Sequence, residues 1–426
     1  MKRMASGQNK FPKHLANEVI EHWEHIVSGE YVTPPCPSIS QLREILEVAY
    51  LAACAPEEGR FPSFNLVVVP TASLDDQNIG MTVYRLSEPR RLSVAELRRL
   101  APATDLKKSA VLIGWDEDGV VVAGISDLGT SWHRARMGLS YSYSVPSALI
   151  IQIDRPGRLK VYQGPYAVAG LVDGDLVASR IELSLFMHST IRSGFDRLVE
   201  EFSVPQYEHP KDFEGFWWIA FYNIFASITN TISASGHGGT LIVAADEHVP
   251  NSSDLRIKYP VESMELRSAF IDFINARNVT ADCWTRIELG HDDVEQDFRA
   301  ELALLDATNR LVEAIRLIAQ FAGCDGAILI TSDLRVIGFG VEIRSELAAE
   351  CIVEEVTSDY GEEGEICDIE QFGMRHRSAI KLSSRVPGVC VLAVSQDGPI
   401  SGVWSKEGKV LIKKGANLPN MNLPFS

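Results

Sequence analysis

Two short segments in the second half of the chain contain the residue types that chemistry on phosphates requires. The first is Gly323-Cys-Asp-Gly-Ala327, which comes directly before an apolar strand. A carboxylate at the start of a strand, here Asp325, can bind a hard metal ion or accept a proton from a hydroxyl group. Gly326 lacks a side chain and lets a flat ligand approach the backbone. Taken alone, the segment also fits an ordinary turn before a buried strand.

The second segment is Gly373-Met-Arg-His-Arg-Ser-Ala379, in which Arg375 and Arg377 flank His376 and Ser378 follows. Two guanidinium groups and a hydroxyl suit a phosphate chain, because arginine binds phosphate oxygens through paired hydrogen bonds. A helix that begins here adds the positive potential of its N-terminus. A basic surface turn, paired with the acidic stretch before it, is the alternative interpretation of this motif alone.

The chain is acidic, with 40 Lys and Arg against 57 Asp and Glu in 426 residues and a formal charge of −17. A surface of this sign repels nucleic acid and anionic lipid. We therefore expect no nucleic-acid partner and no membrane partner, and we expect an anionic ligand to be held by a few well-placed arginines or lysines. The hydrophobic share of 46% is that of a soluble globular protein with two or three domains.

The cysteines form no CxxC pair, so a zinc site has little support and buried free thiols are the expectation. The seven cysteines are Cys36, Cys54, Cys283, Cys324, Cys351, Cys367 and Cys390. Reduced thiols, the lack of a signal-peptide pattern and the lack of an apolar run of membrane-spanning length together predict a cytoplasmic protein.

The first half, residues 1–210, is predicted to be an α+β domain with a mostly antiparallel sheet. Residues 1–60 have helical patterns, and Ser38 or Ser40 can cap the second of their helices. Short strands rich in Val and Ile fill residues 64–179. Turn signals predict hairpins at residues 116–119, 155–158 and 173–174.

The domain boundary is expected after residue 210. A helical stretch from 180 to 202 closes the first half, and the polar segment 203–210, with two prolines, fits a linker. Residues 211–426 are predicted to form an α/β domain with a mixed sheet. Its aromatic segment, 213–228, fits a dimer surface, a signalling helix or core between the two domains.

Within the second domain, strands and helices alternate. An apolar strand at 240–245 leads through a polar connection to helices near 261–277 and 294–321, and several apolar strands follow. One face of the later helix contains Leu304, Leu311, Ile315 and Ile318. The acidic stretch 344–370 fits a solvated helix and loop, and a charged lid over the site is the alternative. His237, between glycines, fits a structural loop histidine or a residue that faces the site.

The order of these segments resembles that of the diadenylate cyclase (DAC) domain family, whose signatures are a DGA and an RHR motif. The resemblance covers residues 221–415 and depends on GHGGTLIV, DGAILIT, GMRHRSA and VCVLAVSQDGPIS in the expected order. The first half resembles the sensor-like domains found ahead of some DAC domains, an association that depends on its position in the chain.

The resemblance implies that two such domains face each other, each with one ATP and a divalent ion, Mg²⁺ or Mn²⁺. Each ribose 3′-hydroxyl attacks the α-phosphate of the opposite ATP, so that two pyrophosphates leave and cyclic di-AMP forms. A homodimer or a higher homo-oligomer is therefore implied. The N-terminal domain is expected to sense an unknown ligand or partner and to set the geometry of the catalytic pair.

The resemblance also gives each candidate residue a role by its position. Asp325 binds the metal and helps to activate the 3′-hydroxyl, His376 lies beside the metal and the phosphates, and Asp397 is a further metal ligand. The phosphates are held by Arg375, Arg377 and Ser378. The other nucleotide contacts are Gly326, Ala327, Gly338 and Ser395.

The chain departs from the family pattern at two points. Met374 stands where the family commonly has threonine, and Ser395-Gln396-Asp397 replaces Ser-Glu-Glu. Two alternatives therefore stay open beside the diadenylate cyclase. One is a domain that binds nucleotides without joining them, as a sensor or scaffold, and the other is a cyclase with a different cyclic nucleotide as its product.

Overall fold

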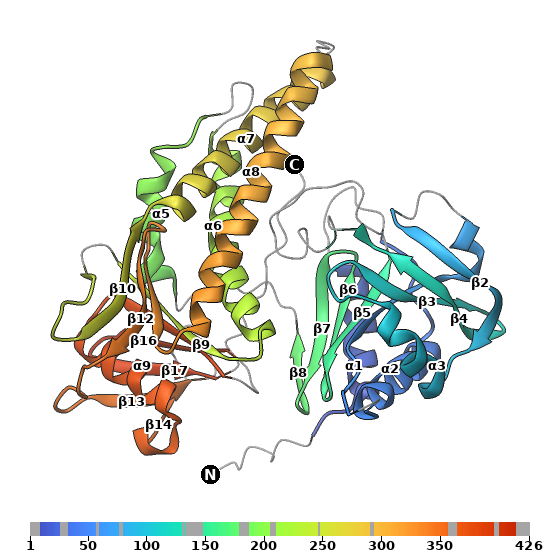
Figure 1. Ribbon diagram of the computed structural model, residues 1–426, viewed down its shortest axis with the longest axis horizontal. Helices are drawn as coiled ribbons and strands as arrows, with labels where there is room; N and C mark the ends of the chain where they lie inside the picture. Colours follow the sequence, from blue (N-terminus) through green and yellow to red (C-terminus); the bar gives the residue numbers. More distant parts are fainter. Residues whose placement is uncertain are drawn as a thin grey trace. The chain divides into compact units, whose positions relative to one another are not determined.

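Tertiary contacts divide the chain into two compact units, unit 1 from Met1 to Ile181 and unit 2 from Glu182 to Pro424. The computed structural model describes residues 9–25, 33–56, 59–75, 80–129, 132, 148–178, 187–204, 210–245, 248–289, 294–356, 364–395 and 400–414. Each unit contains a mixed sheet together with helices, which confirms the predicted fold class (Figure 1).

The sheet of unit 1 has the strand order β2-β4-β3-β1-β5-β6-β7-β8. Its strands are β1 (Phe64–Pro70), β2 (Thr82–Arg91), β3 (Ser109–Asp116), β4 (Gly119–Asp127), β5 (Leu149–Arg155), β6 (Arg158–Gln163), β7 (Tyr166–Val172) and β8 (Asp175–Ala178). The pair β1–β3 is parallel and the other neighbouring pairs are antiparallel, as predicted. The three predicted hairpins are confirmed as β3–β4, β5–β6 and β7–β8.

Three helices pack with the sheet of unit 1 in one large apolar cluster. They are α1 (Pro12–His22), α2 (Ile39–Cys54) and α3 (Val94–Leu100). Ser38, rather than Ser40, caps α2: its hydroxyl accepts a hydrogen bond from the Gln41 backbone, and the Gln41 side chain accepts one from the Ser38 backbone. Such a reciprocal cap contributes about 1 kcal/mol to helix stability.

The sheet of unit 2 has the strand order β10-β12-β11-β9-β15-β16-β17-β13-β14. Its strands are β9 (Gly239–Ala244), β10 (Leu255–Ser263), β11 (Ala327–Thr331), β12 (Val336–Ile343), β13 (Ile352–Val356), β14 (Gly364–Ile366), β15 (Val389–Val394), β16 (Ile400–Lys406) and β17 (Lys409–Lys413). The pairs β9–β11 and β13–β17 are parallel and the others are antiparallel, so the sheet is mixed, as predicted.

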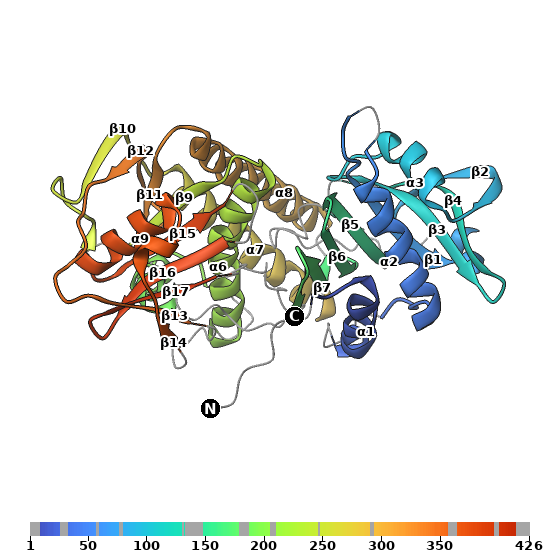
Figure 2. The ribbon, with the colours of Figure 1, turned by 90° about the horizontal axis from the view of Figure 1, so that it is seen from below.

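The helices of unit 2 pack on this sheet and on one another. They are α5 (His188–Val199), α6 (Pro210–Ala234), α7 (Glu265–Glu288), α8 (Val294–Gln320) and α9 (Met374–Arg385). Helix α9 lies against β15 and β16 (Figure 2). Helix α8 has nearly the predicted bounds, whereas α7 continues eleven residues beyond the predicted end at Arg277. Its partner α8 supports these extra turns, which the sequence pattern of α7 alone did not indicate.

The division between the units falls after residue 181, whereas the sequence placed it after residue 210. Helix α5 belongs to unit 2 because its apolar residues pack there. The Phe195 ring meets the rings of Trp218 and Phe221 edge-on or tilted, at centroid distances of 5.0 and 5.4 Å. The aromatic segment of α6 is therefore core within unit 2. Residues 205–209 of the predicted linker lie outside the described residues.

Two segments that the sequence did not predict as strands belong to the sheet of unit 2. Strand β10 lies where the sequence predicted a polar connection, although Leu255, Ile257, Tyr259 and Val261 follow the two-residue period of a strand. It pairs only with β12 at the edge of the sheet and exposes most of its residues. The acidic stretch contains β13 and β14 rather than a helix. Glu354 and Glu355 pair with Lys409 and Lys414 at 2.6 and 2.8 Å, which fixes part of this stretch to the sheet.

The cysteines of the chain are free thiols, as predicted, but only Cys283 and Cys390 are buried. Cys36, Cys351 and Cys367 are half-buried, and Cys54 and Cys324 are exposed. Burial raises the pKa of the Cys36 thiol to about 12. Among the described helices, none combines the length and the apolar run that crossing a membrane requires.

The packing of α5 generates a prediction about stability. A Cβ on Gly194 would lie 2.2 Å from the backbone carbonyl of Ser332, so we expect Gly194→Ala to lower the free energy of unfolding by about 1–3 kcal/mol. A Cβ on Gly215, in α6, meets no atom within 4 Å, so Gly215→Ala should instead stabilise by up to about 1 kcal/mol. Urea denaturation of both variants measures the difference, and equal effects would contradict the close approach of α5.

Candidate functional site

The register of three strands brings the predicted motifs to one edge of the sheet of unit 2. Strands β9 and β11 run parallel with Ile328 opposite Leu241, so the residues before each strand, Gly238 and Asp325, lie level with each other. Strand β15 runs antiparallel to β9 and ends with Val394 opposite Gly239. Ser395 therefore follows at the same edge. Gly238 and Ser395 are 157 residues apart in the sequence, and strand pairing alone brings them to the same edge.

The RHR motif reaches the same edge from the start of α9. The Arg375 guanidinium donates a hydrogen bond to the carbonyl of His237, 3.3 Å away. Gly373 precedes α9 and has no side chain with which to cap the helix. The first backbone N–H groups of a helix and its dipole make this end positive. His237 is thus exposed at the site and contacts Arg375 through its backbone.

Asp325 presents its carboxylate to solvent. Its side chain has a relative exposure of 103%, and Lys258 on β10 places its Nζ 3.7 Å from a carboxylate oxygen and 3.5 Å from the Asp325 carbonyl. Lys258 could not be found from the sequence, because a single lysine on a mostly exposed edge strand forms no motif. The structure makes it the cation nearest to Asp325 among the ion pairs of the described residues.

The turn at Gly326 lies directly against β12. Its φ is +124°, and a Cβ would lie 2.5 Å from the carbonyl carbon of Gly340. Only glycine fits both conditions. The space that a side chain at position 326 would need is therefore occupied by the backbone of β12. Ala327 is buried in the apolar cluster behind the sheet, and Gly338 is buried between β10 and β11.

Three aromatic rings form a stack beside this turn. Phe339 on β12 stacks on Tyr259 of β10 at 4.9 Å and on Phe321 at 4.4 Å, with interplanar angles of 24° and 14°. Tyr259 is 51% exposed, so the stack offers a ring at the surface. A flat apolar surface of this kind suits a nucleobase. The rings come from three separate segments, so no local sequence pattern groups them.

His376 is half-buried and its Nε2 lies 3.0 Å from the hydroxyl of Ser401 on β16. Burial lowers the pKa of His376, and the positive charges of Lys414 and Arg375 lower it further. The ring is therefore neutral at pH 7. Because Nε2 is engaged with Ser401, the ring nitrogen left for a metal ion or a phosphate is Nδ1. Ser401 is a second site residue that the sequence analysis missed.

The two arginines of the motif have different partners. Arg377 donates to Glu370 at 2.6 Å, whereas Arg375 donates to the His237 carbonyl. Residues two apart on a helix point to different sides, which explains the split. Arg377 thus pairs with the acidic stretch, as the alternative interpretation of this motif expects. Ser378 is half-buried on α9, and Asp397 and Gln396 lie outside the described residues.

The donor set at this edge fits a hard divalent ion. Mg²⁺ binds through one or two carboxylates and completes its shell with water and substrate phosphates, and Asp325 offers such an exposed carboxylate. The residues that the structure describes contain one cluster of three groups at metal-binding distances: Glu18, Glu21 and His22 on α1 of unit 1. An ion at the site would therefore depend on Asp325 together with the nucleotide.

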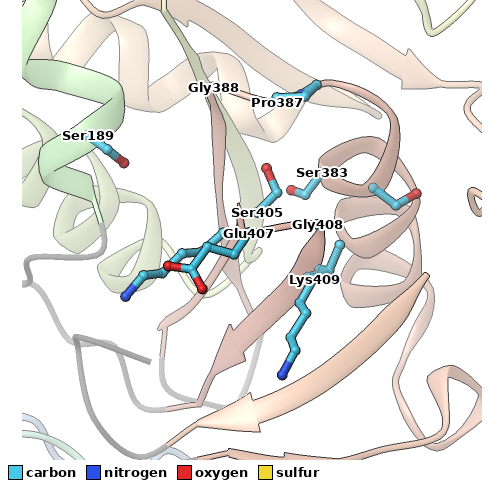
Figure 3. A pocket seen from close by; sticks show the side chains of 11 residues that line it. Ser189, Ser383, Pro387, Gly388, Ser405, Glu407, Gly408 and Lys409 are labelled. Atoms are coloured by element: carbon cyan, nitrogen blue, oxygen red, sulfur yellow. The ribbon is translucent and has the colours of Figure 1, made fainter. Parts of the chain in front are cut away.

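A separate hollow of about 340 Å³ lies at the opposite end of α9 from the RHR motif (Figure 3). It is lined by the end of α9, by Ser189 of α5 and by the β16–β17 turn, including Ser405 and Lys409. None of the described residues that the motifs predicted lines it. The candidate site at the sheet edge is thus separate from this half-open hollow.

The surroundings of His376 generate a prediction. Because its pKa is lowered in the folded state, the unfolded chain binds more protons below about pH 6.5, and this group makes the folded state less stable as the pH falls through that range. Lys414→Met should raise the pKa of His376, whereas Lys413→Met should leave it unchanged. NMR titration of the imidazole signals, assigned with His376→Gln, measures both. An unchanged pKa in Lys414→Met would contradict the electrostatic cause.

Comparison with known proteins supports the sensor half of the expectation. The family described as "Probable sensor domain DACNV" matches residues 31–127, which include α2 and the strands β1 to β4 of unit 1. No curated protein and no solved structure matches the chain. Unit 1 therefore contains a segment similar to a sensor domain.

Proposed function

We propose that unit 2 condenses two ATP molecules into cyclic di-AMP and that unit 1 regulates this reaction as a sensor. The observation that carries the proposal is the meeting of Asp325, the GHGG turn and the start of α9 at one edge of the sheet. The match of unit 1 to a sensor family found ahead of DAC domains supports the pairing of the two units.

The residues at the edge suit phosphoryl transfer, which depends mainly on positioning and on charge stabilisation. In each half of the reaction a ribose 3′-oxygen attacks the α-phosphorus of the facing ATP. The bond from that phosphorus to the bridging oxygen breaks, and pyrophosphate leaves with the electron pair. Asp325 is the carboxylate positioned to help take the proton of the 3′-hydroxyl.

Positive groups around Asp325 would stabilise the charge on the phosphates. Arg375, Lys258 and the N-terminus of α9 supply hydrogen-bond donors there. Asp325 would hold Mg²⁺ or Mn²⁺, which when bound neutralises charge on the phosphate oxygens. The adenine would stack on the exposed ring of Tyr259.

The reaction joins two nucleotides, whereas each unit 2 offers one copy of this edge. Two copies must therefore face each other, and the proposal includes a homodimer as the active form. Turnover per chain should fall when dilution separates the copies.

A nucleotide-binding unit without catalysis is the second candidate, and two observations favour it. Met374, at the first position of α9, is 77% exposed and presents a thioether where a hydroxyl was expected. Arg377 is also held by Glu370. Both features weaken the binding of phosphates, and neither prevents the stacking of a nucleobase.

The first test of the proposed function is product formation by the full chain with Mg²⁺ or Mn²⁺ and either ATP or GTP. We expect cyclic di-AMP by mass spectrometry, and we expect Asp325→Asn to lower kcat by about 100-fold or more. Asp118→Asn, at an exposed turn of unit 1, is the matched control and should be unaffected. Binding of ATP without any product would favour the nucleotide-binding alternative, and a guanine product would correct the substrate.

Lys258 generates a second prediction about activity. We expect Lys258→Ala to raise the KM for ATP about tenfold, because loss of one charged contact to phosphate costs roughly 1.4 kcal/mol. Arg256→Ala is the matched control, since Arg256 lies two residues earlier on the same face of β10 but pairs with Glu342. Steady-state kinetics of both variants measure the effect. A KM for ATP of Lys258→Ala equal to that of the wild type would show that Lys258 does not bind the nucleotide.

A further inference from the structure

Helix α8 has two apolar faces on opposite sides. One face packs inside unit 2 and includes Ala300, Ala307, Leu311, Ile315 and Ile318. The second face is exposed to solvent and consists of Val294, Phe298, Leu302 and Leu305. Their exposed fractions are 72%, 61%, 49% and 49%, which is high for four large apolar side chains on one helix.

These four side chains form a continuous stripe. At 3.6 residues per turn they fall within an arc of about 80°, roughly 150° from the centre of the buried face. Ile287 and Leu289, at the end of α7, add exposed apolar surface at the same end of the hairpin, with 45% and 61% exposed. Figure 1 shows that the paired helices α7 and α8 extend away from the sheet of unit 2. Contiguous exposed apolar surface on such an arm indicates an interaction site.

The charges beside the stripe exclude an anionic membrane as the partner. Glu295, Glu301 and Asp306 flank it together with Arg299 and Arg310, and residues 182–426 as a whole contain 21 Lys and Arg against 37 Asp and Glu. Acidic lipid would repel this surface. A protein partner must offer both an apolar stripe and cations at matching positions.

A second copy of the same helix meets these conditions. If two α8 helices pack antiparallel with Leu302 at the two-fold axis, Phe298 of one copy lies within one residue, about 1.5 Å along the axis, of the level of Leu305 of the other. The same arrangement sets Arg299 within one residue of the level of Asp306, and Glu295 within one residue of the level of Arg310, of the second copy, on one flank of the stripe. Because the two-fold axis repeats each pair, four pairs of opposite charges would thus flank the apolar contact. Within one copy, Arg310 already pairs with Glu265 at 2.8 Å and with Asp272, and Arg299 pairs with Glu295, so the contacts between copies would extend existing ion pairs.

We propose that α8 is a self-association surface that joins two copies of this chain in antiparallel orientation. In this arrangement the two Asp325 residues lie at opposite ends of the helix pair. From Leu302 to the end of α8 is about 27 Å at 1.5 Å per residue, so the two sites are separated by roughly 54 Å. The α8 contact is therefore distinct from the face-to-face pairing of two ATP sites, and this last consequence rests on the proposed function.

The test compares the mass of the full-length protein in solution with that of α8 variants, by sedimentation velocity over a wide range of concentration. We expect Leu302→Glu to halve the largest mass reached by the wild type. Leu317→Glu is the matched control, because Leu317 is 55% exposed on the same helix but lies outside the stripe. Circular dichroism melting shows whether each variant is folded. Equal masses for wild type and Leu302→Glu, or an equal loss in Leu317→Glu, would overturn the proposal.

A charge exchange tests the antiparallel register without removing apolar surface. Asp306→Arg alone should weaken association, because it faces Arg299 of the second copy, and the double variant Arg299→Asp with Asp306→Arg should restore it. A double variant as weak as the single one would overturn this register. Cyclase activity is measured on the same samples at saturating ATP. Self-association without product would count against the proposed function alone, and product with no effect of Leu302→Glu on mass would count against the α8 surface alone.

Discussion

The candidate site depends on the register between β9 and its two neighbours in the sheet of unit 2. Parallel pairing with β11 sets the GHGG turn beside Asp325, and antiparallel pairing with β15 sets Ser395 at the same edge. All three strands are buried along their length, so a shift of one residue would turn core side chains toward the opposite face. The geometry of the site is thus held by the hydrophobic core beneath it.

Charge is distributed unevenly between the two units. Residues 1–181 contain 19 Lys and Arg with 20 Asp and Glu, so nearly the whole net charge of −17 belongs to the remainder of the chain. Within this acidic unit, Arg375, Lys258 and the start of α9 gather positive groups at one edge. An anionic ligand is therefore drawn to that edge and repelled elsewhere on the unit.

The segment that follows unit 1 is fixed to the strand that begins beside Asp325. Helix α5 packs through Gly194 against Ser332, at the far end of β11. The buried Arg267 of α7 pairs with Asp333 at 2.9 Å and also with Glu201, just after α5. Removing one partner of such a buried pair is costly, because the other charge remains desolvated. Any change transmitted through α5 therefore reaches the turn that ends β11.

The sequence by itself determined the two α/β-type halves, the hairpins of unit 1, the length of α8 and the DGA and RHR segments, because periodicity, turn residues and local charge act over a few residues. It did not find Lys258, Ser401 or the stack of Tyr259, Phe339 and Phe321, and it placed Arg375 and Arg377 together although they have separate partners. It also placed α5 in the first domain. These features were decided by tertiary structure, because strand pairing and core packing bring together residues whose own neighbours in the chain give no sign of the contact.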